Sequence, residues 1–187
     1  MSVPVMIGAR RVQARSSEAE AALDHLVERC SERGYRIARD LLGESAAAED
    51  AVQEALAAAM QGVGRLREPA ALEGWFYRVL TNHCMRVLRR RRWLSLWIGR
   101  RAEEIAEDAG AGAPSPSAAL ASARQSARLV AAVRTLPPMQ QASVVLRYAH
   151  DRSVDDVGAL LGVSPKTVKT HLVRGLRALR IALEEEP

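Results

Sequence analysis

Apolar residues in this chain recur at intervals of three and four positions, which is the spacing of one buried face on an α-helix. The alternation of apolar and polar residues that marks a strand is rare, and aromatic side chains make up only 4% of the sequence. Residues that favour strands are correspondingly sparse. The pattern predicts an all-α protein, in which helices pack together through their apolar faces.

The strongest helix signals lie near the C-terminus. Gly162 can end one helix in the left-handed conformation, Ser164 can cap the next helix, and Pro165 suits its first turn. Upstream, Ser153 and Asp156 have the spacing of a capping box, in which each side chain accepts a hydrogen bond from a free backbone amide. These signals predict two short-linked helices that meet at a tight corner, as in a helix-turn-helix.

The second of these helices has two chemically different faces. We expect one face to be buried through Val168, Leu172, Leu176, Leu179 and Leu183. The remaining surface carries cations and hydroxyls, with no Asp or Glu between Asp156 and Glu184. Such a surface suits a polyanion, and a helix-turn-helix inserts the first turns of its second helix into the major groove. The face opposite the buried one carries Lys166, Thr167, Thr170, Arg174 and Arg177, with Lys169 and His171 on its flanks. The alternative is a solvated basic surface on an ordinary helical hairpin.

An acidic surface is predicted on the helix EDAVQEALAAAMQGV, nearer the N-terminus. We expect Val52, Leu56, Ala59 and Val63 to form its inner stripe. Asp50, Gln53 and Glu54 then lie together on the outer face. Carboxylates near a helix N-terminus also interact favourably with the helix dipole, so a purely structural role is the alternative to a binding surface.

A third surface is predicted on the segment GWFYRVLTNHCMRVLRRRR. We expect its buried side to consist of Phe76, Leu80, Cys84 and Val87. The opposite side carries Trp75, Arg78, Asn82, Met85, Arg86 and Arg89, and the arginine run continues through Arg90 to Arg92. Cations beside an exposed aromatic ring are typical of surfaces that hold phosphates and stack on bases. A solvated helix end or a protein-binding patch is the alternative.

Composition divides the chain into two domains. Its 187 residues, 48% of them hydrophobic, are sufficient for one or two small cores. Between the apolar-periodic regions, EEIAEDAGAGAPSPSAA has the composition of a flexible linker. The predicted divisions are a helical domain over residues 17–92, a linker over 93–117 and a helix-turn-helix domain over 118–186. The segment WLSLWIGRR is either a patch that packs on a domain or partner, or a helix end with exposed tryptophans.

Charge is distributed unevenly along the first domain. Residues 16–60 contain four Arg and ten Asp or Glu, a net charge of −6, whereas residues 65–101 contain ten Arg and two Glu, a net charge of +8. An acidic block followed by a basic block indicates two partners, of which the second is an anion.

Several classes of function are not supported by the sequence. Cys30 and Cys84 are isolated, so we expect small buried side chains rather than a disulfide framework or a zinc site. The four histidines are scattered, and no nucleophile–base pair or glycine-rich phosphate loop is present. We therefore expect no enzymatic activity and no cofactor.

The charge order of the N-terminus is not that of a secretory signal, and no segment has membrane-spanning length. These two features predict a cytoplasmic protein without membrane insertion.

Taken in order, these motifs resemble those of bacterial extracytoplasmic-function (ECF) sigma factors. The resemblance is carried by the acidic helix AEDAVQE, by WFYRV with Asn82 and the arginine run, by LPPMQ and LRY after the linker, and by the helix-turn-helix. It covers nearly the whole chain. The resemblance implies a non-enzymatic protein that binds RNA polymerase core and directs initiation at promoters, with two helical domains matching regions 2 and 4.

The resemblance also assigns roles to the three surfaces. Asp50, Gln53 and Glu54 match the surface that docks on the clamp helices of the largest polymerase subunit. Trp75, Arg78, Asn82, Arg86, Arg89 and Arg90 match the region that binds the minus-ten element as it melts. Lys166, Thr167, Lys169, Thr170, His171 and Arg174 match the helix that reads the minus-thirty-five element as duplex. The second domain would also contact the flap of the second-largest subunit, and an anti-sigma factor is implied as a further partner.

Other expectations from the resemblance concern less regular segments. The loop from Gly64 to Glu73 would hold a flipped base, and four acidic linker residues would follow the path toward the polymerase active centre: Glu103, Glu104, Glu107 and Asp108. Many relatives have Arg where this chain has His171 and Ala where it has Gly175, so the base preference there is not specified. The inducing signal, the promoter sequence and the role of the N-terminal tail are not specified either.

The rival hypothesis is a helix-turn-helix repressor or activator whose first domain senses a ligand or dimerises. Such a regulator would share the corner at Gly162. It has no reason to carry the acidic face around Asp50 or the Trp-Arg-Asn-Arg face, and these two features favour the sigma factor.

Overall fold

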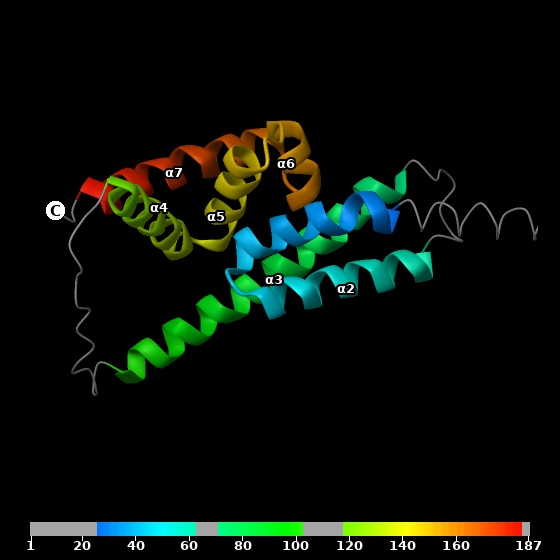
Figure 1. Cartoon of the computed structure of the whole chain (residues 1–187), viewed down its shortest axis with the longest axis horizontal. Coiled ribbons are helices and arrows are strands. Elements are labelled where there is room, and N and C mark those ends of the chain that lie inside the picture. The colour runs from blue at the N-terminus through cyan, green and yellow to red at the C-terminus, as the bar shows by residue number, and fades with distance from the viewer. Residues whose placement is uncertain (1–25, 63–70, 103–117, 185–187) are drawn as a thin grey trace, which may run out of the picture. The chain divides into compact units, whose positions relative to one another are not determined.

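The computed structural model describes residues 26–62, 71–102 and 118–184. Every secondary-structure element in these ranges is helical, which confirms the all-α prediction. A helix over residues 26–42 precedes α2 (Ser45–Gly62) and α3 (Ala71–Ala102), and the later elements are α4 (Ala118–Thr135), α5 (Pro138–Val144), the π-helical turn η2 (Val145–Ala149), α6 (Val154–Leu161) and α7 (Pro165–Glu184) (Figure 1). Contacts between residues divide the chain into two compact units.

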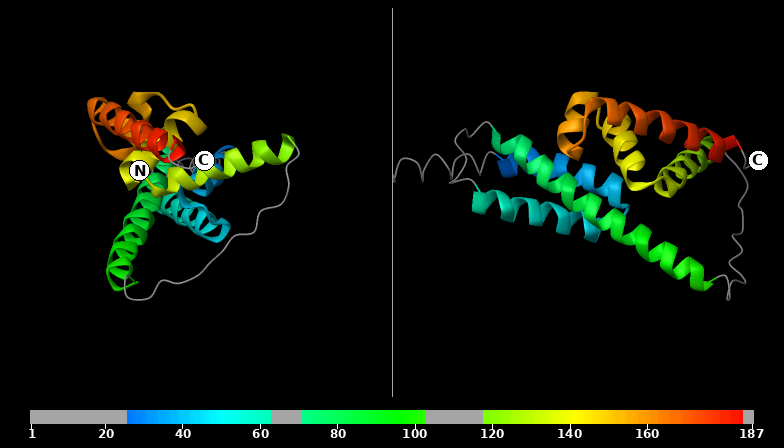
Figure 2. Two further views of the ribbon diagram at one scale, coloured as in Figure 1. Left: turned by 90° about the vertical axis from the view of Figure 1, so that its left-hand side faces the viewer. Right: turned by 180° about the vertical axis from the view of Figure 1, so that it is seen from behind.

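The first three helices lie side by side (Figures 1 and 2). The first of them ends at Gly43, whose φ of +80° allows the chain to reverse while its N–H donates to the Arg39 carbonyl at 2.8 Å. Phe76 and Leu80 of α3 are fully buried. Gly34 allows the close approach of Phe76, because a Cβ at this position would lie 3.0 Å from the ring carbon Cε1.

Helix α3 buries two rows of side chains where the sequence predicted one. The predicted row is present in Phe76, Leu80 and Cys84, with Val87 half-buried. A second buried row runs beside it through Tyr77, Thr81, Met85 and Leu88. The expectation that Met85 lies on the exposed side was therefore wrong, since its side chain is only 3% exposed. The Thr81 hydroxyl donates to the Tyr77 carbonyl at 2.7 Å, so this polar residue has a hydrogen-bond partner in the second row.

The predicted end of the first domain at residue 92 is not a helix end. Helix α3 continues through the WLSLWIGRR segment to Ala102, and Trp93 and Trp97 remain exposed on it. The two tryptophans are thus exposed near a helix end, as in the second alternative, and packing on a partner stays a prediction. The predicted linker lies mainly in residues 103–117, outside the described residues.

Helix α7 packs on α5 and α4 through a row of buried residues. Val168, Leu172 and Leu179 belong to this row as predicted, but Gly175 takes the place expected for Leu176. Leu176 is 43% exposed and Leu183 is 37% exposed, so both of these expectations were wrong. The helices approach closely at the glycine, where a Cβ would lie 3.0 Å from Val144 Cγ2. Leu176, the next residue, is consequently turned to the edge of the interface.

The corner between α6 and α7 forms as the sequence predicted. Gly162 has a φ of +69°, Pro165 is the first residue of α7, and the Ser164 hydroxyl accepts a hydrogen bond from the Thr167 N–H at 3.2 Å. At the start of α6, the Asp156 N–H donates to the Ser153 hydroxyl at 3.0 Å and the Ser153 N–H donates to the Asp156 carboxylate at 3.2 Å. The Ser153 hydroxyl also donates to the Asp156 carboxylate at 2.7 Å, and the hydrogen bonds that this carboxylate accepts from the hydroxyl and the N–H of Ser153 lower the pKa of Asp156.

Substitution of Gly158 by alanine is expected to destabilise this corner. A Cβ there would lie 2.8 Å from the Val163 carbonyl oxygen, a backbone atom that cannot rotate away. The forced backbone shift should lower the free energy of unfolding by about 1–3 kcal/mol, measured by urea denaturation. Gly74→Ala is the matched control, because nothing lies within 4 Å of its added Cβ, and it should leave stability unchanged or raise it by up to about 1 kcal/mol. Equal stability of the two variants would contradict the predicted clash.

Two buried groups in α3 make the protein sensitive to alkali. Burial raises the pKa of Cys84 from 9.0 to about 12, and burial beside the Cys30 thiol raises the pKa of Tyr77 from 10.0 to about 12. Because the unfolded chain loses these protons first, their contribution to stability is complete below pH 9 and is lost as the pH rises toward 12. Tyr77→Phe should lessen the loss of stability above pH 10, measured by urea denaturation across this range; an unchanged pH profile would contradict the assignment.

Both cysteines are buried, as the sequence predicted, and neither forms a disulfide bond. Within the described ranges, no group of three His, Cys, Asp or Glu side chains could hold a metal ion. None of the helices in those ranges is both long enough and apolar enough to cross a membrane.

Candidate nucleic-acid interface

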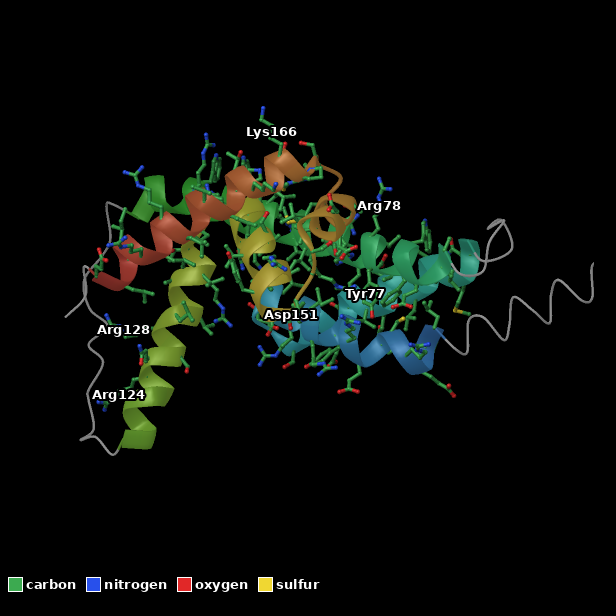
Figure 3. All side chains as sticks on the ribbon, turned by 90° about the horizontal axis from the view of Figure 1, so that it is seen from above. Tyr77, Arg78, Arg124, Arg128, Asp151 and Lys166 are labelled. Carbon is green, nitrogen blue, oxygen red and sulfur yellow. The ribbon has the colours of Figure 1, made fainter. Side chains whose placement is uncertain are left out.

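The basic face of α7 projects into solvent. Lys166, Lys169, Thr170 and Arg174 are exposed, and Figure 3 shows Lys166 extending away from the ribbon. Thr167 is half-buried, and its hydroxyl forms a 2.8 Å hydrogen bond with that of Ser164. The structure therefore brings the predicted cations together on one face, while Thr167 also takes part in the cap that orients the first turn.

His171 lies at the edge of this face and is half-buried. Its Nδ1 is buried and has no hydrogen-bond partner in the structure. The Nε2 edge of the ring is therefore the part available to a ligand. In the neutral tautomer with the proton on Nε2, the ring would present a single donor.

One exposed residue of this face was missed by the sequence analysis. Val173 is 68% exposed and lies one helical turn from both Lys169 and Arg177. Its position outside the row of Val168, Leu172 and Leu179 was a signal that could have identified it. An apolar side chain among major-groove cations can contact the methyl group of thymine.

Helix α3 carries the second basic face. Arg78, Asn82, Arg86, Arg89 and Arg90 are all exposed, and Arg78 extends away from the helix in Figure 3. The sequence contains no Asp or Glu between Glu73 and the end of α3. The guanidinium groups of this face are thus not compensated by a carboxylate on the same helix after its first turn.

Trp75 differs from the other residues predicted for this face, because it is half-buried. A Cβ at Gly62, the last residue of α2, would lie 3.2 Å from the Trp75 ring carbon Cη2. The indole therefore packs over the end of α2, and only part of it remains available to a ligand. The loop that follows α2 lies at residues 63–70, outside the described residues, so the predicted base-binding loop has no structural account.

The acidic face of α2 is arranged as predicted. Asp50, Gln53 and Glu54 are all exposed on one side of the helix. The other side buries small residues together with Val52, namely Ala48, Ala51, Ala55 and Ala59. Leu56 is half-buried, and Val63 lies beyond the part of the chain that the structure describes. The small buried residues let α2 approach its neighbours closely while its carboxylates remain in solvent.

Comparison with known proteins identifies both halves of the chain. The family model for Sigma-70 region 2 matches residues 26–94, and that for Sigma-70 region 4 matches residues 126–179. The ECF RNA polymerase sigma factor SigE of Mycolicibacterium smegmatis is 36% identical over 161 residues, covering 84% of this chain and 60% of the relative. SigM of Mycobacterium tuberculosis, also an ECF RNA polymerase sigma factor, is 30% identical over 163 residues, covering 82% of this chain and 72% of the relative.

A solved structure shows the same fold. The sigma factor RpoE of Bartonella quintana, in complex with the anti-sigma factor NepR, aligns with a TM-score of 0.53 over 92% of this chain and 98% of that chain, at 21% identity. The two region models and the relatives show that this chain belongs to the sigma-70 family, within its ECF sigma factors. Matches to both regions disfavour the rival hypothesis of a helix-turn-helix repressor or activator.

Proposed function

We propose that this chain binds RNA polymerase core and directs promoter-specific initiation by recognising minus-ten and minus-thirty-five elements. The observation that carries this proposal is the coexistence, within the region 2 match, of an exposed acidic face on α2 and an exposed basic face on α3. A regulator that binds only duplex DNA needs neither. The proposed divisions are residues 17–92 and 118–186, with α3 extending the first to Ala102.

Duplex recognition of the minus-thirty-five element is assigned to α7. Capping by Ser164 fixes the start of α7. Lys166 projects from its first turn, and Lys169 and Thr170 project from its second. Lysine and arginine donate to guanine edges and to phosphates in the major groove. His171 would add one donor through Nε2, and Arg174 would contact the backbone a turn later.

Recognition of the melting minus-ten element is assigned to α3. Arginine guanidinium groups bind phosphates and stack on bases, and the Asn82 amide both donates and accepts hydrogen bonds. These groups suit bases that have left the duplex. The α2 face with Asp50, Gln53 and Glu54 is assigned to the clamp helices of the largest polymerase subunit, and the second domain to the flap of the second-largest subunit.

An anti-sigma factor is a further proposed partner. The similar RpoE from Bartonella quintana was solved with the anti-sigma factor NepR, which supports such a partner for a chain of this fold. We further propose that this chain has no catalytic activity of its own, needs no cofactor, and acts in the cytoplasm, where polymerase and promoters are found.

Binding of promoter DNA with and without core polymerase tests the proposal. The purified chain should bind duplex promoter weakly, and addition of core should give a specific complex that survives competitor DNA. Tethering two weak DNA contacts to one polymerase raises the effective concentration of the second contact. Tight, specific binding of duplex by the chain alone would instead indicate the helix-turn-helix regulator.

Removal of two cations from α7 should reduce the salt dependence of promoter binding. Each lost phosphate contact lowers the slope of log affinity against log salt by about 1, so Lys166→Ala with Lys169→Ala should lower it by about 2. Arg180→Ala is the matched control on the same helix, because the Arg180 guanidinium already pairs with Glu184 at 2.8 Å. An unchanged slope in the double variant would place the DNA elsewhere.

A further inference from the structure

The exposed tryptophans at the end of α3 form a pair. The Trp93 and Trp97 rings are stacked, with centroids 5.9 Å apart and planes inclined by 18°. Their side chains are 60% and 58% exposed, and Leu94 beside them is 37% exposed. Tryptophan is ordinarily well buried, so two indoles held together in solvent mark an interaction surface.

The pair continues the basic face of the same helix. Asn82, Arg86, Arg90 and Trp93 follow one another at intervals of three or four, and Trp97 lies one turn further. The α-helical rise places Trp97 about 12 Å beyond Arg89 along this face. The C-terminal part of α3 also runs past the ends of the two helices that lie beside it (Figures 1 and 2).

The charge around the pair selects its partner. Arg89, Arg90 and Arg92 are exposed immediately before it, and no Asp or Glu follows Glu73 in α3. An apolar protein surface would match the indoles but would have to desolvate these guanidinium groups. Single-stranded DNA matches both, because its bases stack on aromatic rings while its phosphates pair with arginines.

We propose that Trp93 and Trp97 form a stacking platform for unpaired bases of the melted promoter, next to the bases held by the Arg78–Arg90 face. This inference rests on the proposed function and extends the minus-ten surface by one site. The rings are already stacked on each other, so a base would add to the outer face of the pair. The aromatic contact is tolerant of sequence, since every base has a π-face.

Replacement of both tryptophans tests this platform. Holoenzyme containing Trp93→Ala and Trp97→Ala should bind a forked promoter, with an unpaired minus-ten strand and adjoining unpaired bases, about tenfold more weakly for each base that loses its stack. Its affinity for core polymerase should stay unchanged. The double phenylalanine variant should recover most of the loss, because it keeps aromatic rings. Ser95→Ala is the control, as Ser95 is exposed on another side of α3.

Abasic DNA separates stacking from other causes of weak binding. Removing the adjoining unpaired bases should weaken the wild type but leave the double alanine variant unaffected. The platform is overturned if the double alanine variant binds the intact fork as tightly as the wild type does. It is also overturned if the variant binds more weakly than the wild type by the same factor on the intact and the abasic forks. Loss of core affinity would show that the pair docks on polymerase, which also overturns it. Failure of wild-type holoenzyme to bind the fork would instead refute the proposed function.

Discussion

Replacement of both Asp50 and Glu54 with lysine is expected to abolish association with core polymerase. Both side chains are exposed on α2, so the change should not disturb the buried row of small residues beneath them. Truncation of a hot-spot residue at an interface costs about 2 kcal/mol or more, and like-charge juxtaposition costs several kcal/mol. The two reversals together should weaken binding by roughly 1,000-fold or more, measured by fluorescence titration of labelled chain with core.

The control for this variant is Glu49→Lys, which makes the same charge change at the adjacent exposed position. It alters the net charge of α2 without changing the predicted docking residues, and its effect should be much smaller. Circular dichroism should show unchanged helix content in both variants. Equal losses in the control and the double variant would mean that overall charge, rather than this surface, determines the association.

Removal of the α3 side chains Arg78, Asn82 and Arg86 is expected to prevent recognition of the minus-ten element. A hydrogen bond to a charged group contributes about 1.5–3 kcal/mol, so the two arginines alone account for a loss of affinity of roughly 100-fold. The triple alanine variant should bind core normally and fail to hold a forked promoter. A filter-binding titration of preassembled holoenzyme with the fork measures this loss.

Lysine substitution at Arg78 and Arg86 refines the result. The lysine pair keeps both charges but loses the planar guanidinium, so phosphate contacts should survive and base stacking should be lost. We expect an affinity between those of the wild type and the triple variant. A lysine variant equal to the wild type would show that these residues supply charge only, and an unaffected triple variant would place minus-ten recognition outside α3.

The helix-turn-helix was predictable because its signals are local. Gly162, Ser164 and Pro165 act within a few residues of themselves, and their conformations and hydrogen bonds formed as expected. The same holds for the reciprocal hydrogen bonds of Ser153 and Asp156. Capping chemistry depends little on tertiary packing, which explains why it could be derived from the sequence.

Errors arose where packing decides the outcome. The second buried row of α3 could not be inferred from one apolar stripe, so Met85 was placed on the wrong side. On α7, a hydrophobic pattern places Leu176 rather than Gly175 in the buried row. The structure buries Gly175 instead, because Val144 approaches too closely for a larger side chain. Trp75 is half-buried against Gly62, a residue far from it in sequence. Partner helices, which no local pattern specifies, determined all three positions.

Continuation of α3 past Arg92 was likewise not predicted. Consecutive arginines followed by WLSLWI gave no glycine, proline or capping residue at which the helix would stop, and the helix extends to Ala102. The domain boundary predicted at residue 92 therefore lies within a continuous helix and stays a prediction. This continuation is what aligns Trp93 with the basic face and makes the stacking platform possible.

Run-off transcription tests the central claim most directly: the purified chain is mixed with core polymerase and a library of promoter fragments from the genome that encodes it. The account predicts transcripts that start at defined sites only when the chain is present, that are lost when Asp50 and Glu54 are replaced with lysine, and that share a minus-ten and a minus-thirty-five sequence. A chain that binds core but yields no specific transcript above core alone would contradict it.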